Sequence, residues 1–237
     1  MRNLKAMIVC ELKTFIREPM GATFIIVFPL IMFISTIVLQ GKSVIQSTLP
    51  GNIGMTIAAA GLLGVTINLA MNRENKVLKR LQTTGLSSLT LICADYVVLC
   101  VFSVLGILAQ LIIALIINGV FSTNYTLFII DLIISSIYFF ALAFFIGSYV
   151  KEVKSVHAIT STLFTVMLIF SGTTFPLDNM PTLTKAISSI LPLTQVNLLL
   201  QSDLIGTDYK FRIASYVYIF ISTIVFLSIG KKTFKWG

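Results

Sequence analysis

Six long apolar segments recur along the chain, and they constrain its fold more than any other feature. Each is about 20 residues long, the length that an α-helix needs to cross the hydrocarbon core of a bilayer. Helices are expected there, because each satisfies its own backbone hydrogen bonds where no water is present. The six segments are residues 20–40, 52–71, 96–117, 132–150, 157–174 and 213–230.

Composition places the chain in a membrane rather than in water. Only 11% of its residues are charged and 57% are hydrophobic, whereas a soluble domain carries about 25% charged residues. So few charges could not cover a soluble surface. The alternation typical of membrane β-strands is missing. We therefore predict an all-α integral membrane protein with six transmembrane helices, in which residues 1–237 form a single transmembrane domain.

The basic residues indicate how the chain crosses the membrane. The net charge is +8. With six spans and an inner N-terminus, 13 of the 17 Lys and Arg residues fall in inner segments, which is the bias of cytoplasmic loops. Both termini are therefore predicted to be cytoplasmic, and the charge reports orientation rather than a nucleic-acid partner. The abundance of Ile, Lys and Asn indicates an AT-rich bacterial genome, so we expect the membrane to be a bacterial plasma membrane.

The first 18 residues predict an amphipathic helix along the cytoplasmic membrane interface. Apolar residues gather on one face, and Arg2 and Arg17 lie on the other, where they can meet anionic headgroups. Glu11 interrupts the apolar face, which leaves room for a protein partner. Pro19 marks the end of the helix, and the first span follows directly.

The longest connection, residues 175–212, lies between the last two spans on the predicted outer side. Pro176, Pro181 and Pro192 divide it, and short apolar stretches lie between them. These stretches are too short to cross the bilayer and too apolar for water. We expect one or two re-entrant half-helices that dip into the outer leaflet.

Motifs that would support catalysis are incomplete. Gly41–Ser43 reads GKS, as at the end of a P-loop, but Thr36 stands where that pattern needs its first glycine. His157 is the single histidine, and one imidazole cannot complete a zinc protease site. Asp95 and Asp131 lie near the ends of their spans, where we expect solvated carboxylates rather than a proton relay. The sequence predicts no catalytic residue, no metal site and no cofactor bound by this chain.

Residues 72–88 place five charges within eight positions, between two apolar segments. An ordinary cytoplasmic loop needs positive charge but no amphipathic order. Here the pattern predicts a short helix with an apolar ridge at Val77 and Leu81 and an exposed charged flank at Arg73 and Arg80. A soluble partner could hold such a helix.

Three segments in this order resemble those of ABC-2-type permeases, the membrane subunits of one class of ABC exporter (the drug, peptide and lipid export class). The family's connector helix and first span resemble ELKTFIREPMGATFIIVFPLIMFI. Its coupling segment resembles NRENKVLKRLQTTGLSS, residues 72–88. Its outer re-entrant signature resembles FSGTTFPLDNMPTLTKAISSILPLTQVNLLL. The resemblance covers essentially the whole chain.

The resemblance implies how such a subunit works. Two permease copies, or two sister permeases, would pair with two separate cytosolic ABC ATPase subunits, which would bind ATP and Mg²⁺. The coupling segment would rest in a groove of the ATPase beside the connector helix, and spans two and five would line the cargo route. The implied residues are Arg73, Glu74, Val77, Leu78, Arg80, Leu81 and Thr84 for coupling; Glu11, Phe15, Arg17, Glu18 and Pro19 in the connector; Asn68, Met71, Phe164, Met167 and Phe170 on the cargo path; and Pro176, Pro181 and Pro192 in the outer re-entrant region.

The function that follows is export of an amphipathic or lipophilic cargo, such as an antimicrobial peptide, a drug or a lipid-like molecule. The candidate walls carry no ring of charge, which suits such a cargo. The alternatives are a secondary transporter or channel, and a membrane immunity protein that acts alone. A secondary transporter favours an inverted repeat between the chain halves, and none is visible in the sequence.

Overall fold

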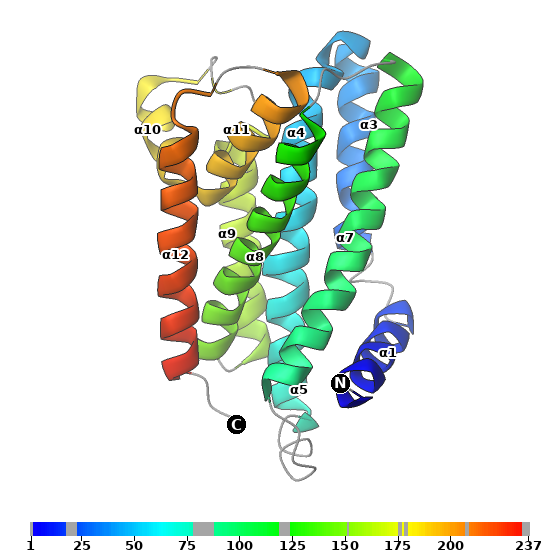
Figure 1. Cartoon of the computed structure of the whole chain (residues 1–237), viewed down its shortest axis with the longest axis vertical. Helices are drawn as coiled ribbons and strands as arrows, with labels where there is room; N and C mark the ends of the chain where they lie inside the picture. Colours follow the sequence, from blue (N-terminus) through cyan, green and yellow to red (C-terminus); the bar gives the residue numbers. More distant parts are fainter. Residues whose placement is uncertain are drawn as a thin grey trace.

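In the computed structural model, all regular structure in the described part of the chain is helical. The helices form an elongated bundle (Figure 1). The C-terminal ends of α5 and α12 lie at one end of the bundle, which we call the terminal end. α10 and α11 lie at the opposite end, which we call the far end. The described residues are 2–17, 23–77, 88–118, 124–150, 152–174, 177, 180–206 and 209–233.

Six helical segments of the described chain are long and apolar enough to cross a membrane. This confirms the predicted multi-pass, all-helical membrane protein. The segments are Thr23–Gln40 (η1, Thr23–Val27, and α3, Phe28–Gln40), Ile45–Glu74 (α4, Ile45–Ala58, η3, Ala59–Val65, and α5, Thr66–Glu74), Cys93–Ile117 within α7 (Ser88–Asn118), Tyr125–Tyr149 (α8), Val153–Phe170 (α9) and Arg212–Thr233 (α12).

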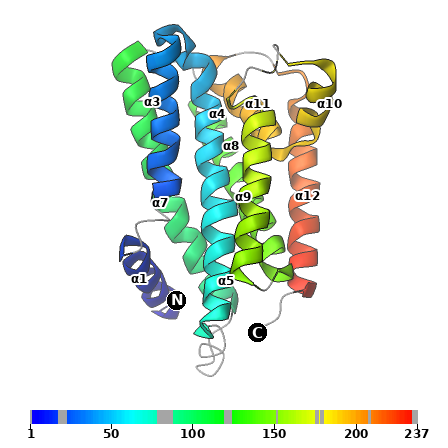
Figure 2. The same cartoon turned by 180° about the vertical axis from the view of Figure 1, so that it is seen from behind.

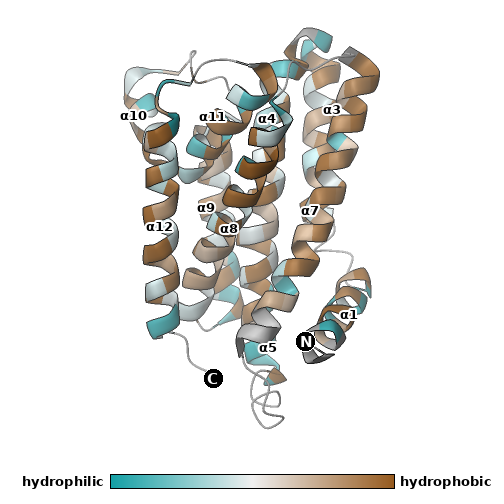
Figure 3. Cartoon of the chain, in the orientation of Figure 1, coloured by the Kyte–Doolittle hydropathy of each residue, from teal (hydrophilic) through white to brown (hydrophobic). Residues whose placement is uncertain are grey.

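The outer surface of the bundle suits lipid. Large apolar side chains of α7 are exposed, among them Val101, Leu105 and Ile112. Figure 3 shows hydrophobic residues along the length of α7 and α12. A soluble protein rarely exposes so continuous an apolar surface.

The second span is longer than the apolar pattern predicts. The prediction was 52–71, whereas the helix covers Ile45–Glu74. Polar side chains near its start bond to their own helix: Thr48 Oγ1 donates to the Val44 carbonyl at 2.9 Å, and Asn52 Nδ2 donates to the Thr48 carbonyl at 3.0 Å. Polar groups satisfied in this way can enter an apolar environment, and an apolar pattern therefore underestimates the length of the helix.

This second span is the centre of the bundle. Of its apolar window, 83% is buried, against 50% for α8 and no more than 28% for the other four spans. Small residues allow the close packing: Gly54 lies against Asn197, and Gly61 lies against Phe139 of the same chain. Lipid tails are as apolar as leucine, so close packing of this kind holds membrane helices together. Figure 2 shows the span with α3 on one side and α9 on the other.

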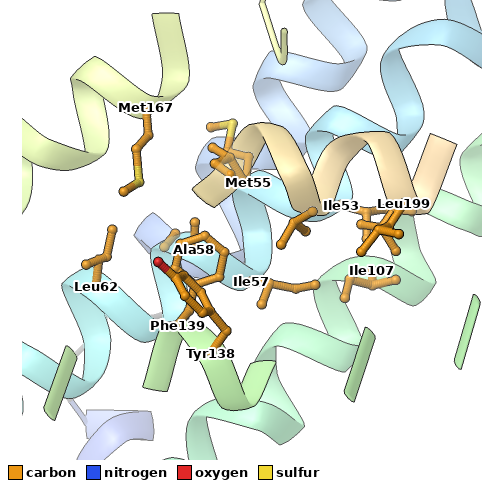
Figure 4. Packing of buried hydrophobic residues seen from close by; sticks show 14 of the residues in the cluster. Ile53, Met55, Ile57, Ala58, Leu62, Ile107, Tyr138, Phe139, Met167 and Leu199 are labelled. Carbon is orange, nitrogen blue, oxygen red and sulfur yellow. The ribbon is translucent and has the colours of Figure 1, made fainter. Parts of the chain in front are cut away.

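One apolar cluster surrounds the half of the second span that lies toward the far end. Ile53 and Ile57 of α4 lie near Ile107 of α7 and Leu199 of α11 (Figure 4). Phe139 of α8 belongs to the same cluster. The central helix is therefore in contact with elements from both halves of the chain. Because the interior is closely packed, a movement of this helix would displace the side chains of those elements.

Two shorter helices occupy the far end, in the region where half-helices are predicted. α10 (Thr182–Ile190) and α11 (Pro192–Ile205) meet at an angle of 91°. Pro181 precedes the first turn of α10, and Pro192 is the first residue of α11, where a proline costs no hydrogen bond. Pro176 lies outside the described residues. A broken span and a re-entrant pair would both have this geometry, so the predicted half-helices stay a prediction.

The N-terminal helix α1 (Arg2–Arg17) lies beside the terminal half of α7 (Figure 1). Phe15 is buried, and its ring centroid lies 4.4 Å from that of Phe102. Arg17 is exposed and Glu11 is partly buried. Glu18 and Pro19, the other two residues implied for a connector, lie outside the described residues.

Candidate functional site

The end of α5 is where the central span meets the predicted coupling segment. α5 ends at Glu74, and a turn follows, in which the Lys76 amide donates to the Arg73 carbonyl at 3.0 Å and Lys76 has a positive φ of 57°. Glu74 and Lys76 are exposed, and Val77 is partly buried. Leu78, Arg80, Leu81 and Thr84, which the resemblance assigned to coupling, lie outside the described residues.

Arg73 is not where the sequence predicts it. We expected an exposed flank residue, but Arg73 is only 8% exposed. Its Nη1 donates to the carbonyl of Gly147 at 2.9 Å and to the carbonyl of Val150 at 3.1 Å. The last carbonyls of a helix lack partners inside that helix, and α8 ends at Tyr149. Through Nη1, the buried guanidinium satisfies two carbonyls at this end of α8.

Arg73 thus caps the C-terminal end of α8 from another helix. A positive charge at this end of a helix stabilises it by about 0.3–2 kcal/mol. α9 begins at Val153, three residues beyond Val150. Beside the cap is a cavity of about 450 Å³, lined by Arg73, Glu74, Glu152, Val153 and Lys154. The end of α5 and the α8–α9 turn therefore share one charged surface at the terminal end.

The packing between the second span and α8 extends from this cap into the bundle. Thr66 Oγ1 donates to the Ala143 carbonyl at 3.5 Å, a separation of 77 positions. Leu69 lies against Gly147, where an added Cβ would be 2.8 Å from Leu69 Cδ2. We call these contacts, with Gly61 against Phe139 and Arg73 against Val150, the α5–α8 seam. Each pair is 77 or 78 positions apart, so the helices run parallel in constant register.

Asn68, a predicted cargo-path residue, forms a hydrogen bond between helices. Its Nδ2 donates to Asp95 Oδ1 at 2.9 Å and joins α5 to α7. Asp95 is only 4% exposed, so the expectation of a solvated carboxylate was wrong. The reason is that α7 begins at Ser88 and Asp95 lies two turns inside the helix. Met71, the other candidate on this span, is partly buried.

The candidates on α9 pack inside the bundle. Phe164 is 6% exposed and Met167 is 2% exposed, and both belong to the main apolar cluster. Figure 4 shows the Met167 side chain on the side of α9 that faces Leu62. Phe170, at the end of α9, is partly buried. Spans two and five are in contact, and the implied role of these three side chains in a cargo route stays a prediction.

A polar cluster at the far end was not predicted from the sequence. Arg212 Nη2 of α12 lies 2.7 Å from Asp131 Oδ2 of α8 and 2.5 Å from Asp203 Oδ1 of α11. Tyr216 donates to the other oxygen of Asp131 at 2.6 Å. Asp131 is fully buried, so the solvated end position predicted for it was wrong as well. The only signal in the sequence was the position of single charges beside the spans.

A buried hydrogen bond between two polar side chains, also not predicted from the sequence, lies deeper in the bundle. Gln110 of α7 donates through Nε2 to Thr56 Oγ1 of α4 at 2.7 Å, and both side chains are buried. Three residues later the central span changes to the π-helix η3, Ala59–Val65. Short π-helical stretches are frequent at functional sites. Among the described residues, no group of three or more His, Cys, Asp or Glu could hold a metal ion.

Together these features define a multi-pass helical membrane protein with a tightly packed central span and a charged surface at the end of that span. A family model described as ABC-2 type transporter matches residues 2–202. The chain therefore belongs to the ABC-2 type transporter family, and it is a transport permease. A search of the curated proteins found no match.

Proposed function

We propose that this chain is the membrane-spanning subunit of an ATP-driven exporter that moves an amphipathic or lipophilic cargo out of the cell. The observation that carries the proposal is the continuity of the most buried span, Ile45–Glu74, with the charged coupling segment, residues 72–88. Force applied to that segment would reach the central span through the backbone at Glu74 and the turn that follows it. ATP and Mg²⁺ would bind to a separate ABC ATPase subunit, not to this chain.

The terminal end offers a surface for that ATPase. Glu74, Glu152 and Lys154 are exposed there and line the cavity of about 450 Å³. Lys76, two residues after Glu74, is exposed as well. α1 lies near this end, beside α7 (Figure 2). Most basic residues of the chain fall in the segments at this end, so the positive-inside rule favours a cytoplasmic location. α1 would then act as the connector helix beside the coupling segment.

A second permease, either a copy of this chain or a sister, would cover α9. His157, Thr162 and Thr165 are exposed on this span. Polar side chains that face lipid are costly and are usually turned toward other helices or a water-filled route. The Thr165 hydroxyl donates to the Ser161 carbonyl of its own helix at 2.8 Å, so the exposed His157 and Thr162 are the side chains that support a pair of permeases meeting at α9.

The far end supports an amphipathic cargo. A cavity of about 530 Å³ lies among α10, α11 and α12, within the range of small-molecule sites. Leu198 and Phe211 supply apolar walls, and Lys185, Gln195 and Tyr218 supply polar groups. A molecule with an apolar body and a polar end suits this mixture. The bent pair α10 and α11 would then be the re-entrant half-helices at the exit.

The alternative functions differ in the energy source that would drive transport. A secondary transporter or channel would carry cargo down a gradient with no soluble partner, and an immunity protein acting alone would need no ATP. Membership of the ABC-2 family favours the ATP-driven reading. Purification from native membranes under mild conditions separates them, because only an exporter subunit should retain an ABC ATPase.

The test of coupling replaces three basic residues of the segment by Lys76→Glu, Lys79→Glu and Arg80→Glu. Two lipophilic probes, Hoechst 33342 and a fluorescent phospholipid, report ATP-driven uptake into inside-out vesicles that contain the complex. We expect uptake of at least one probe by the wild type and at least a tenfold loss in the triple variant. The matched control, Lys231→Glu with Lys232→Glu, changes exposed lysines at the end of α12 and should retain uptake.

The outcomes separate the two parts of the proposal. If an ATPase co-purifies but neither probe moves, the cargo class is wrong and the ATP-driven permease stands. If the triple variant keeps full uptake, the segment does not couple hydrolysis to movement. If no ATPase associates with the wild type, the exporter reading is refuted.

A further inference from the structure

We propose that Arg73 is a positioning residue that joins the second span to the α8–α9 turn, so that α5, the end of α8 and the start of α9 move as one unit. This inference rests on the proposed function, because the movement begins at the coupling segment. It assigns Arg73 an internal role in place of the ATPase contact that the sequence suggested.

The contacts of Arg73 point inward. The side chain is 8% exposed, and its Nη1 donates to two carbonyls on α8 and on the turn that follows. One acceptor, Gly147, lies inside α8, and the other, Val150, lies one residue past its end. A single cation therefore holds the helix and the turn together. Glu152, which precedes α9, lies only two residues beyond Val150.

The seam keeps the two helices from sliding past each other. Leu69 occupies the space where Gly147 lacks a side chain, and Phe139 fills the corresponding space at Gly61, where an added Cβ would be 2.7 Å from Phe139 Cβ. A shift of either helix along its axis would drive these side chains into a neighbouring turn. Packed interfaces of this kind move as a block or switch in discrete steps, but do not deform continuously.

The consequence is a second route for the movement. A displacement of the coupling segment would be transmitted to the central span through the backbone. It would be transmitted to α9 through Arg73 and the α8–α9 turn. Spans two and five, which carry the candidate cargo-path residues, would then respond to one input. The direct packing of α9 on the second span would still transmit part of the movement, so without Arg73 we expect α9 to move less than α5 rather than with it.

Spin-label distances test this without knowledge of the cargo. The complete complex with its ATPase is reconstituted in nanodiscs, from a chain whose native cysteines are replaced by alanine. Two label pairs are compared, Val97→Cys with Asn75→Cys and Val97→Cys with Ile159→Cys, all at exposed positions. The distances are measured without nucleotide and after trapping with ATP and vanadate.

We expect both distances to change on trapping in the wild-type background. In Arg73→Met the change at Asn75 should persist, and the change at Ile159 should fall to less than half of its wild-type size, because only the direct packing of α9 on the second span remains. Arg73→Lys, which keeps a cation able to donate to the carbonyls, should keep the change at Ile159 above half of its wild-type size. Lys232→Met, a loss of exposed charge at the end of α12, should change neither result. An unaltered change at Ile159 in Arg73→Met would overturn the proposal.

A cross-link gives an independent test if Arg73→Met fails to fold. A Cβ at Gly147 would be 3.6 Å from Leu69 Cβ, within the range that a disulfide spans. In the complex that carries Leu69→Cys and Gly147→Cys, we expect the oxidised and reduced forms to hydrolyse ATP within twofold of each other. A tenfold loss on oxidation, reversed by reductant, would show that the two helices separate in the cycle and would refute the unit.

The inference and the proposed function fail in different ways. If no ATPase binds the wild-type chain, the proposed function falls, and the inference falls with it. If the wild type shows ATP-dependent distance changes but Arg73→Met shows the same ones, only the inference falls.

Discussion

Arg212 and Asp131 form a salt bridge of 2.7 Å between α12 and α8, although 81 positions separate them in the chain. The same Arg212 nitrogen contacts Asp203 of α11 at 2.5 Å. The bridge therefore ties three helices together at the far end. Both carboxylates are buried, whereas the arginine side chain is 23% exposed.

Loss of this cation should destabilise the far end strongly. Arg212→Met leaves two buried carboxylates without their ion-pair partner, and breaking a buried pair in this way costs about 3–5 kcal/mol. We expect a clear decrease in the thermal unfolding midpoint of the protein in detergent. Arg212→Met combined with Asp131→Asn and Asp203→Asn should recover most of the loss. An unfolding midpoint unchanged in the single variant would contradict the structural role of the cluster.

A methyl group at Gly61 should not be accommodated. An added Cβ there would be 2.7 Å from Phe139 Cβ and 3.0 Å from the Phe139 backbone, so Gly61→Ala must push two helices apart. Overpacking of this kind costs about 1–3 kcal/mol. The control is Gly106→Ala, where the nearest atom is 3.4 Å away and no loss is expected. The comparison is made by thermal unfolding in one detergent, and equal midpoints would argue against the seam.

The bond between Asn68 and Asp95 should be worth more to stability than to transport. Asn68→Leu removes the amide and leaves a buried carboxyl, at a cost of about 1–3 kcal/mol. The double variant Asn68→Leu with Asp95→Leu removes both polar groups and should regain most of that stability. If Asn68→Leu instead leaves the unfolding midpoint intact and changes which probe is transported, Asn68 is a cargo contact.

The apolar pattern alone is enough to predict six helices that are long and apolar enough to cross a membrane. Segments of about 20 apolar residues have few other stable structures. Their ends are less predictable, because residues such as Thr48 and Asn52 are polar in composition but are satisfied inside the helix. The charged segment at residues 72–88 was also visible, since charge clusters stand out in an apolar chain.

The interaction partners of single charged residues could not be predicted from the sequence. Arg73 was predicted to lie on the exposed flank of the charged segment, and Arg212 at the end of the connection 175–212. Their acceptors lie far away in the chain, at Val150 for Arg73 and at Asp131 for Arg212. No periodicity in one sequence reveals which distant residues become neighbours. The same reason explains the buried position of Asp95.

Cysteine labelling of intact cells tests most directly whether the coupling segment faces the compartment that contains ATP. A membrane-impermeant maleimide is applied to chains without native cysteines that carry either Lys76→Cys or Lys185→Cys, both exposed positions at opposite ends of the bundle. We predict that Lys76→Cys reacts only after the cells are permeabilised, whereas Lys185→Cys reacts in intact cells. Labelling of Lys76→Cys in intact cells would contradict the account, because the end of the central span would then face away from any cytosolic ATPase.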